Sequence, residues 1–262
     1  MNKRFSIIYC LLITVLLISC TKSAVDFYDA SLDEQYKIAM NAFNRKNYEK
    51  AKQYFGLIAV RHAGDRMAEA SQFYLAESNY LSKEYILAIE EYSKLIQSMP
   101  QSEYVEEAMF KIGMCYYQLS PGYALDQQYT YEALSNFQHF LEEYPQSDSR
   151  PLVQEKMQEL RDKLGKKEFK QGELYRKMGY FESAIISFDS VLEHFYDTSW
   201  ADDALFWKGE CYYSMRKWEE AEMAFNQFLG TYKDSEYFSR VRDRLKNLKI
   251  KTDDGFQTGS FE

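Results

Sequence analysis

Residue types that could carry out chemistry are present in this chain, but their spacing does not gather them into a reactive site. Three histidines occur, at His62, His139 and His194. None stands with cysteines or carboxylates at metal-ligand spacing, so the sequence predicts no metal site. Acidic pairs such as Glu142-Glu143 fall within predicted helices, where an exposed, solubilising face is a commoner role than acid–base catalysis. Because the sequence also lacks a glycine-rich phosphate loop and a Gly-x-Ser-x-Gly turn, we expect a protein that is not an enzyme and needs no cofactor.

One cysteine lies where covalent modification is expected. Lys3 and Arg4 precede an apolar run over residues 5–18, which is short for a membrane span and has the form of a signal-peptide core. The run leads into Leu17-Ile18-Ser19-Cys20, which resembles the bacterial lipobox. The resemblance implies that Cys20 is lipidated, with acyl chains such as palmitate, and becomes the first mature residue. The alternative is an ordinary signal peptide with a chance cysteine.

Lipidation would fix where the mature chain resides. One acyl chain gives only marginal membrane binding, whereas two or more anchor a protein stably. Thr21 and Lys22 follow the cysteine, and the lack of an aspartate there argues against retention at the inner membrane, by analogy with well-studied lipoproteins. We expect residues 1–19 to be a lipoprotein signal peptide and residues 20–30 a lipidated tether, with the protein on the periplasmic face of the outer membrane.

A repeated spacing predicts the elements that make up most of the chain. In four copies a small residue is followed twelve positions later by an alanine: Ala39 and Ala51, Ala76 and Ala88, Gly172 and Ala184, and Gly209 and Ala221. The third copy, Gly113 and Ala133, has eight additional residues. Aromatic residues flank these alanines, and in three copies Phe, the small residue and Tyr share one helix face at spacings of three and four. Each copy therefore predicts a helical hairpin.

The hairpins resemble the tetratricopeptide repeat, with a basic step of 37 residues. The expected fold is all-α, a solenoid of about five tetratricopeptide-like hairpins with a C-terminal capping helix; the alternative is a generic amphipathic bundle. Glycine within a helix costs roughly 1 kcal/mol relative to alanine, so the glycines at 113, 172 and 209 predict close approach of a partner helix. Ser31-x-x-Glu34 and Ser199-x-x-Asp202 predict capping boxes at two helix starts.

Two irregularities divide the array. Residues 120–129 enlarge the inner turn of the third hairpin, and the distance from the repeat proline to the next glycine grows by 14 residues before the fourth. We expect residues 151–176 to form one long helix, or two collinear helices meeting near Gly165. The domains that follow are a three-repeat module at 31–148, a long helix with a two-repeat module and cap at 149–249, and a disordered tail at 250–262.

Charge and the remaining cysteines exclude other classes of protein. Removing the signal leaves 30 basic against 40 acidic residues, a net charge of −10, which argues against a nucleic-acid partner. Two local basic clusters remain, near residues 166–177 and 240–249, and either could meet an acidic partner surface. Cys115 and Cys211 occupy the same register two hairpins apart, so we expect buried thiols and no disulfide.

The first helices of the front hairpins carry the candidate binding residues. Positions three before, one after and four after each small residue would line a concave side, where aromatic and Met side chains suit apolar peptide segments. Packing between helices is the commoner role for any one of them. The candidate peptide-binding groove comprises Tyr36, Met40, Phe43, Phe73, Tyr80, Phe110 and Tyr117.

The order of these features resembles the BamD family of lipoproteins, which assemble outer-membrane β-barrel proteins. Residues 126–147 match the third repeat of that family and residues 204–212 match its fifth. The resemblance implies a non-enzymatic scaffold whose front repeats receive unfolded barrel precursors and whose back repeats dock the periplasmic domains of a BamA-like barrel protein. Candidate docking residues are Trp207, Arg240 and Arg242.

Other functions remain open at the level of sequence. A periplasmic tetratricopeptide adaptor of cell-envelope or cell-division complexes is one, although such adaptors usually carry an N-terminal coiled coil that is not seen here. A lytic transglycosylase would need a lysozyme-like catalytic domain, for which this sequence has no residues left. Glycan-binding lipoproteins of the SusD type are helical but far longer.

Overall fold

The computed structural model describes residues 27–258, with side chains through Leu248. The predicted signal peptide and Cys20 lie outside the described residues. Eleven helices make up the described chain: α2 (Leu32–Asn44), α3 (Tyr48–Arg61), α4 (Arg66–Leu81), α5 (Tyr85–Ser98), α6 (Val105–Leu119), α7 (Gln128–Glu143), α8 (Arg150–Lys177), α9 (Phe181–His194), α10 (Ala201–Ser214), α11 (Trp218–Thr231) and α12 (Phe238–Thr258). In this part of the chain there is no strand, and no helix is long and apolar enough to cross a membrane.

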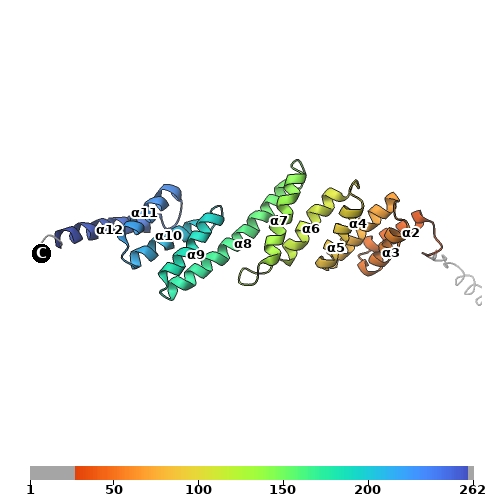
Figure 1. The fold of residues 1–262 in the computed structure, drawn as a ribbon. Helices are drawn as coiled ribbons and strands as arrows, with labels where there is room; N and C mark the ends of the chain where they lie inside the picture. Colours follow the sequence, from red (N-terminus) through yellow and green to blue (C-terminus); the bar gives the residue numbers. More distant parts are fainter. Residues whose placement is uncertain (1–26, 259–262) are drawn as a thin grey trace, which may run out of the picture. The chain divides into compact units, whose positions relative to one another are not determined.

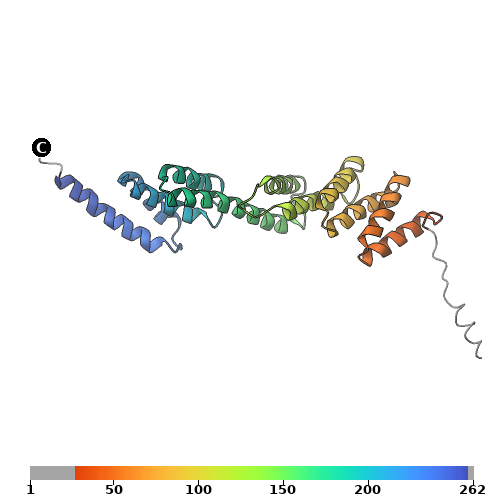
Figure 2. The ribbon, with the colours of Figure 1, turned by 90° about the horizontal axis from the view of Figure 1, so that it is seen from below.

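The helices pair as antiparallel hairpins, as the repeat spacing predicts (Figures 1 and 2). The chain divides into two compact units, residues 1–105 and 106–262. Within the described residues, the first unit contains the hairpins α2–α3 and α4–α5. The second contains α6–α7, the pairs α8–α9 and α10–α11, and α12, which packs against α11. The all-α repeat fold is therefore confirmed.

Close approach at the repeat glycines is confirmed and has a specific cause. An added Cβ at Gly113 would lie 2.5 Å from the Phe137 ring, and one at Gly209 would lie 2.5 Å from the Phe225 ring. Each phenylalanine stands four residues after the repeat alanine and is completely buried. The second helix thus presses an aromatic ring flat onto the first, and only a residue without Cβ leaves room for it.

A second register sets the inner turn of four of the five hairpins. Lys46, Lys83, Gly179 and Arg216 all stand seven residues after the small residue, and all have positive φ, between 59° and 84°. This left-handed conformation reverses the chain between the two helices. Glycine adopts it freely, whereas other residues lose about 1–2 kcal/mol in it. Three of the four turns therefore hold a residue that the conformation disfavours.

Replacing Lys83 with glycine should stabilise the protein by about 0.5–1 kcal/mol. The relief of left-handed strain exceeds the greater freedom of glycine in the unfolded chain, which is about 0.5–1 kcal/mol. Urea unfolding of the mature chain measures the difference. The control is Glu90→Gly at an exposed position within α5, which should lose about 1 kcal/mol because that site is helical. A loss of stability in both variants would contradict the turn assignment.

The boundary between the compact units differs from the expected one. The expected three-repeat module covers residues 31–148, whereas the second unit begins at Glu106 and so contains the third hairpin. The reason is the core that α7 shares with the long helix α8. Phe137 and Phe140 of α7 pack in one cluster with Val153 and Leu160 of α8. This contact joins the third hairpin to the helix that follows it.

The long connection is one continuous helix, α8, of 28 residues. Gly165 does not break it. A Cβ there would lie 2.9 Å from the Thr198 hydroxyl and 3.2 Å from Cβ of Phe195. The glycine therefore lets the α9–α10 turn pack directly against α8.

Two local expectations need correction. The helix α12 continues to Thr258, nine residues beyond the expected end of the cap at residue 249, so the expected disordered tail from residue 250 is largely helical in the backbone. Its sequence is polar but contains no proline, and polarity alone does not end a helix.

The second correction concerns Ser199. It forms no capping box, because α10 starts at Ala201 and its N-cap is Trp200. The capping box of Ser31 and Glu34 is confirmed.

Candidate functional site

Of the predicted groove residues in the first unit, Phe73 is buried, whereas Tyr36, Met40, Phe43 and Tyr80 are half-buried. Phe73 is 5% exposed and stacks on Tyr104 with ring centroids 4.8 Å apart. Tyr36 and Phe43 meet the Phe55 ring edge to face. Burial, with the neighbouring Tyr74 and Tyr104, raises the pKa of Tyr36 to about 12. These ring contacts help to hold the helices together, and Tyr36 and Phe43 keep part of their surface exposed.

The other predicted groove residues are also engaged. Met40 packs against the same core as Phe55, and Tyr80 meets the Tyr85 ring edge to face at 5.6 Å. In the second unit, Phe110 lies against Phe140 at 5.9 Å. The Tyr117 hydroxyl donates to the Glu159 carboxylate of α8, and this bond with burial raises the pKa of the tyrosine. Each of these side chains therefore contacts a neighbouring residue and is half-buried.

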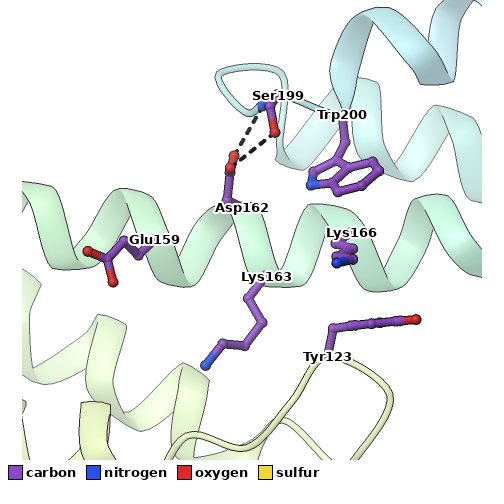
Figure 3. Close-up of a pocket in the computed structure, with 7 residues that line it drawn as sticks. All are labelled: Tyr123, Glu159, Asp162, Lys163, Lys166, Ser199 and Trp200. Carbon is purple, nitrogen blue, oxygen red and sulfur yellow. Dashed lines mark hydrogen bonds between the residues drawn. The ribbon is translucent and has the colours of Figure 1, made fainter.

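An open pocket of about 370 Å³ lies within the second unit, and the sequence analysis did not predict it (Figure 3). Its walls come from the enlarged turn before α7, from one face of α8 and from the start of α10. The lining residues are Tyr123, Glu159, Asp162, Lys163, Lys166, Ser199 and Trp200. The eight-residue insertion noted in the sequence thus builds one wall of a cavity.

Aromatic rings and ammonium groups meet in this pocket. The Lys166 ammonium lies 4.8 Å from the Tyr123 ring centroid and 5.5 Å from that of Trp200, so two rings flank one cation. The Lys163 ammonium donates to the Ser120 hydroxyl at 2.7 Å, and burial lowers the pKa of this lysine. The pocket offers apolar ring surface beside two positive groups.

The two carboxylates of the pocket already have partners. Asp162 accepts from the backbone N–H and the hydroxyl of Ser199, both at 3.1 Å. Glu159 accepts from Lys156 at 2.7 Å, and this contact contributes most to lowering the pKa of the glutamate. These hydrogen bonds and the ion pair fix the positions of both carboxylates in the pocket wall. Within the described residues no cluster of potential metal ligands occurs.

Two of the three predicted docking residues, Trp207 and Arg240, belong to a second group of side chains in the second unit. The Arg176 guanidinium of α8 lies 3.9 Å from the Trp207 ring, and the Arg240 guanidinium of α12 lies 4.7 Å from the Phe206 ring. Phe206 also stacks on Tyr237 at 4.2 Å with the rings nearly parallel. We call Arg176, Trp207, Phe206, Tyr237 and Arg240 the arginine–aromatic cluster.

The cluster joins three helices and was only partly predicted. Trp207 and Arg240 do come together, 6.0 Å apart from guanidinium to ring. Arg242 is exposed on α12 and makes no such ring contact. Arg176 was noted only as part of a basic cluster, although its buried Nε lacks a hydrogen-bond partner in the structure. The spacing of a single helix could not show that α8 and α12 both supply arginines to α10.

Comparison with known proteins decides the family. Residues 28–224 match the family model YfiO, described as "Outer membrane lipoprotein". The chain belongs to the YfiO family. One similar relative is "Outer membrane protein assembly factor BamD" of Rickettsia prowazekii, which is 25% identical over 94% of this chain and 99% of the relative. The protein of the same name from Haemophilus influenzae is 22% identical, over 78% of this chain and 82% of the relative.

Solved structures include other repeat proteins. The "TPR2AB-domain:pHSP90-complex of yeast Sti1" aligns with 84% of this YfiO-family chain and 84% of its own, at 12% identity and a TM-score of 0.48. The YfiO match ends within α11 at residue 224, so it covers the pocket and most of the arginine–aromatic cluster but not α12.

Proposed function

We propose that this chain is a non-enzymatic, lipid-anchored scaffold in the assembly of outer-membrane β-barrel proteins. It would bind the periplasmic domains of a BamA-like barrel protein and segments of unfolded barrel precursors, on the periplasmic face of the outer membrane. Membership of the YfiO family and the names of the two relatives support the assembly role. The observation in the structure that carries the docking part is the arginine–aromatic cluster.

The cluster has the composition of an interface anchor. Trp, Tyr and Arg dominate the binding energy of protein interfaces, because they combine large apolar area with directional polar groups. Here Trp207 remains partly exposed between two guanidinium groups, and Arg240 is exposed. The rings hold the arginines in place before a partner arrives, which reduces the entropy lost on binding. An acidic partner surface fits this arrangement.

Precursor binding fits the pocket better than the predicted front groove. In the first unit Phe73 is buried and the other candidate aromatics are half-buried against neighbouring rings. The rings of Tyr123 and Trp200 instead line an open cavity beside the Lys163 and Lys166 ammonium groups. An extended peptide segment with an apolar or aromatic side chain suits such a wall. We propose this pocket as one contact for unfolded precursors.

Reversing the charge of Arg240 should weaken docking about tenfold, equivalent to about 1.4 kcal/mol. The Arg240→Glu change places a carboxylate beside the Phe206 and Trp207 rings and repels an acidic partner. Quantitative pull-down from detergent-solubilised membranes, scored for a co-purifying outer-membrane barrel protein, measures the effect. Arg242→Glu, run beside it, tests the remaining docking candidate.

The matched control is Lys246→Glu, the same charge change on an exposed position of the same helix. It should leave recovery of the barrel protein unchanged, because residues 240 and 246 face different sides of α12. Equal recovery with Arg240→Glu and with the unaltered chain would reject the cluster as the dock. Recovery of cell-wall or division proteins alone would favour the periplasmic adaptor instead.

A further inference from the structure

The second half of α8 has an apolar face that the rest of the fold does not cover. Leu174 and Met178 are 57% and 56% exposed, and they lie four residues apart on one side of the helix. In the repeat, they stand two and six residues after Gly172. The corresponding residues after Gly209 in α10 are Cys211, which is completely buried, and Met215, which packs against the same core cluster.

The difference arises from what precedes each helix. Cys211 of α10 packs in one cluster with Ala184 and Val191 of α9, which is the second helix of the preceding hairpin. For α8, the preceding second helix is α7, and it covers only the first half. Phe140 of α7 packs against that half, in the cluster that contains Val153 and Leu160. Figure 1 shows α7 along the first part of α8 and α9 beside its second part.

A hydrogen bond marks the position along α8 at which α7 ceases to cover it. The Lys167 ammonium of α8 donates to the backbone carbonyl of Leu125 at 2.8 Å, in the turn just before α7 begins. Leu174 lies seven residues further along the same face of α8, past the N-terminal end of α7. The four-turn extension of α8 therefore moves the fourth hairpin away from the helix that would otherwise cover its leading face.

The register also indicates what kind of element fits there. The same positions of α10 are covered by an antiparallel amphipathic helix, α9, whose packed face includes Ala184, Ser187 and Val191. Small and β-branched residues allow close approach, so a helix of similar composition would fit Leu174 and Met178.

At helical spacing Lys167, Lys170 and Lys177 lie on the same side of α8 as Leu174. One carboxylate, that of Glu173, pairs with both Lys170 and Lys177, so the face keeps an excess of positive charge. A helix carrying carboxylates is favoured by this charge.

We infer that the uncovered face of α8, centred on Leu174 and Met178, docks an acidic amphipathic helix from another protein. That helix takes the place that the second helix of a preceding repeat holds elsewhere in the array. The inference stands apart from the proposed function, since the arginine–aromatic cluster and the pocket lie on other faces. It adds a third contact surface to the second unit.

Site-specific photocrosslinking in intact cells tests this inference. Benzoylphenylalanine is placed at position 174 or 178 of the full-length protein, and the crosslinked segment is sequenced by mass spectrometry. The expected result is a segment of another envelope protein with apolar residues spaced three and four apart and a net negative charge. The control is the same probe at Ile186 on α9, which is also apolar and 71% exposed; its yield should be at least about fivefold lower.

A double variant gives the second measurement. Leu174→Glu with Met178→Glu should reduce the crosslink from a probe at Lys170 at least about tenfold, because it removes the apolar contact and repels carboxylates. Its thermal midpoint should stay within about 2 °C of the unaltered chain, since both side chains are exposed. Crosslinks only to lipid or to a second copy of this chain, or yields equal to those at Ile186, would overturn the inference. An undiminished crosslink in the double variant would do so as well.

Discussion

Replacing Gly209 with alanine is expected to destabilise the protein by about 1–3 kcal/mol, although alanine is the better helix former. The new Cβ would lie 2.5 Å from Cε1 and 2.7 Å from Cδ1 of the Phe225 ring. That ring is completely buried between α10 and α11 and cannot move away without disturbing both helices. The steric loss outweighs the gain in helix propensity of about 1 kcal/mol. Chemical unfolding of the mature chain, followed by circular dichroism, measures the change.

The same substitution at another glycine gives the opposite expectation. Gly230 lies near the end of α11, and an added Cβ there would meet no atom within 4 Å. Gly230→Ala should therefore stabilise the protein by up to about 1 kcal/mol through helix propensity alone. Replacing the Phe225 ring with the smaller side chain of leucine should restore part of the stability that Gly209→Ala removes. The effects of the two substitutions on the free energy of unfolding should therefore be non-additive. Equal effects at the two glycines would show that close approach does not explain the repeat glycine.

The fold was predictable because the repeated spacing of small residues and alanines along the sequence determines it. A fixed offset from Gly209 to Ala221, repeated along the chain, requires a repeated contact between two helices. The structure adds that the contacting group at this glycine is the Phe225 ring. The aromatic at that place was visible in the sequence, but which atom fills the space left by glycine depends on side-chain conformation.

The binding residues were less predictable for a related reason. Phe73 and Tyr36 recur at helical spacing whether they line a groove or pack against the neighbouring helix, because both roles need one face of the same helix. In the structure Phe73 is buried, whereas Tyr36 is half-buried against the core of the first unit. By contrast, the pocket wall at Tyr123 was visible only as an insertion. No local pattern indicates that this loop returns to α8, where Lys166 lies between Tyr123 and Trp200.

The docking residues show the same limit over a longer range. Trp207 and Arg240 are 33 positions apart in the sequence, and Arg176 precedes Trp207 by 31. Each of these intervals spans a helix and two turns, so composition could suggest a basic region but not the stacked geometry. Only the packing of α8 and α12 against α10 brings the two guanidinium groups to the faces of Trp207 and Phe206.

Replacing Cys20 with serine is expected to move the protein from the membrane fraction to the soluble fraction. The residue lies outside the described part of the chain, and the expectation rests on its lipobox-like context. Each buried methylene of an acyl chain contributes about 0.8 kcal/mol, and two or more chains together anchor a protein stably. Serine cannot take the thioether-linked lipid, so the bound share should fall from nearly all to less than about a tenth. Fractionation, with metabolic labelling by an alkyne palmitate analogue, measures both changes.

The matched control is Cys10→Ser, which alters a cysteine that leaves with the predicted signal peptide. It should change neither the labelling nor the membrane-bound share. If Cys20→Ser protein still needs detergent for extraction and still takes up the label, the lipobox interpretation is wrong. Co-purification of a barrel protein with the released Cys20→Ser chain would distinguish docking to that protein from attachment to the membrane through the lipid. Docking through Arg240 and Trp207 uses groups more than 180 residues from the anchor, so it should persist in detergent even where membrane attachment is lost.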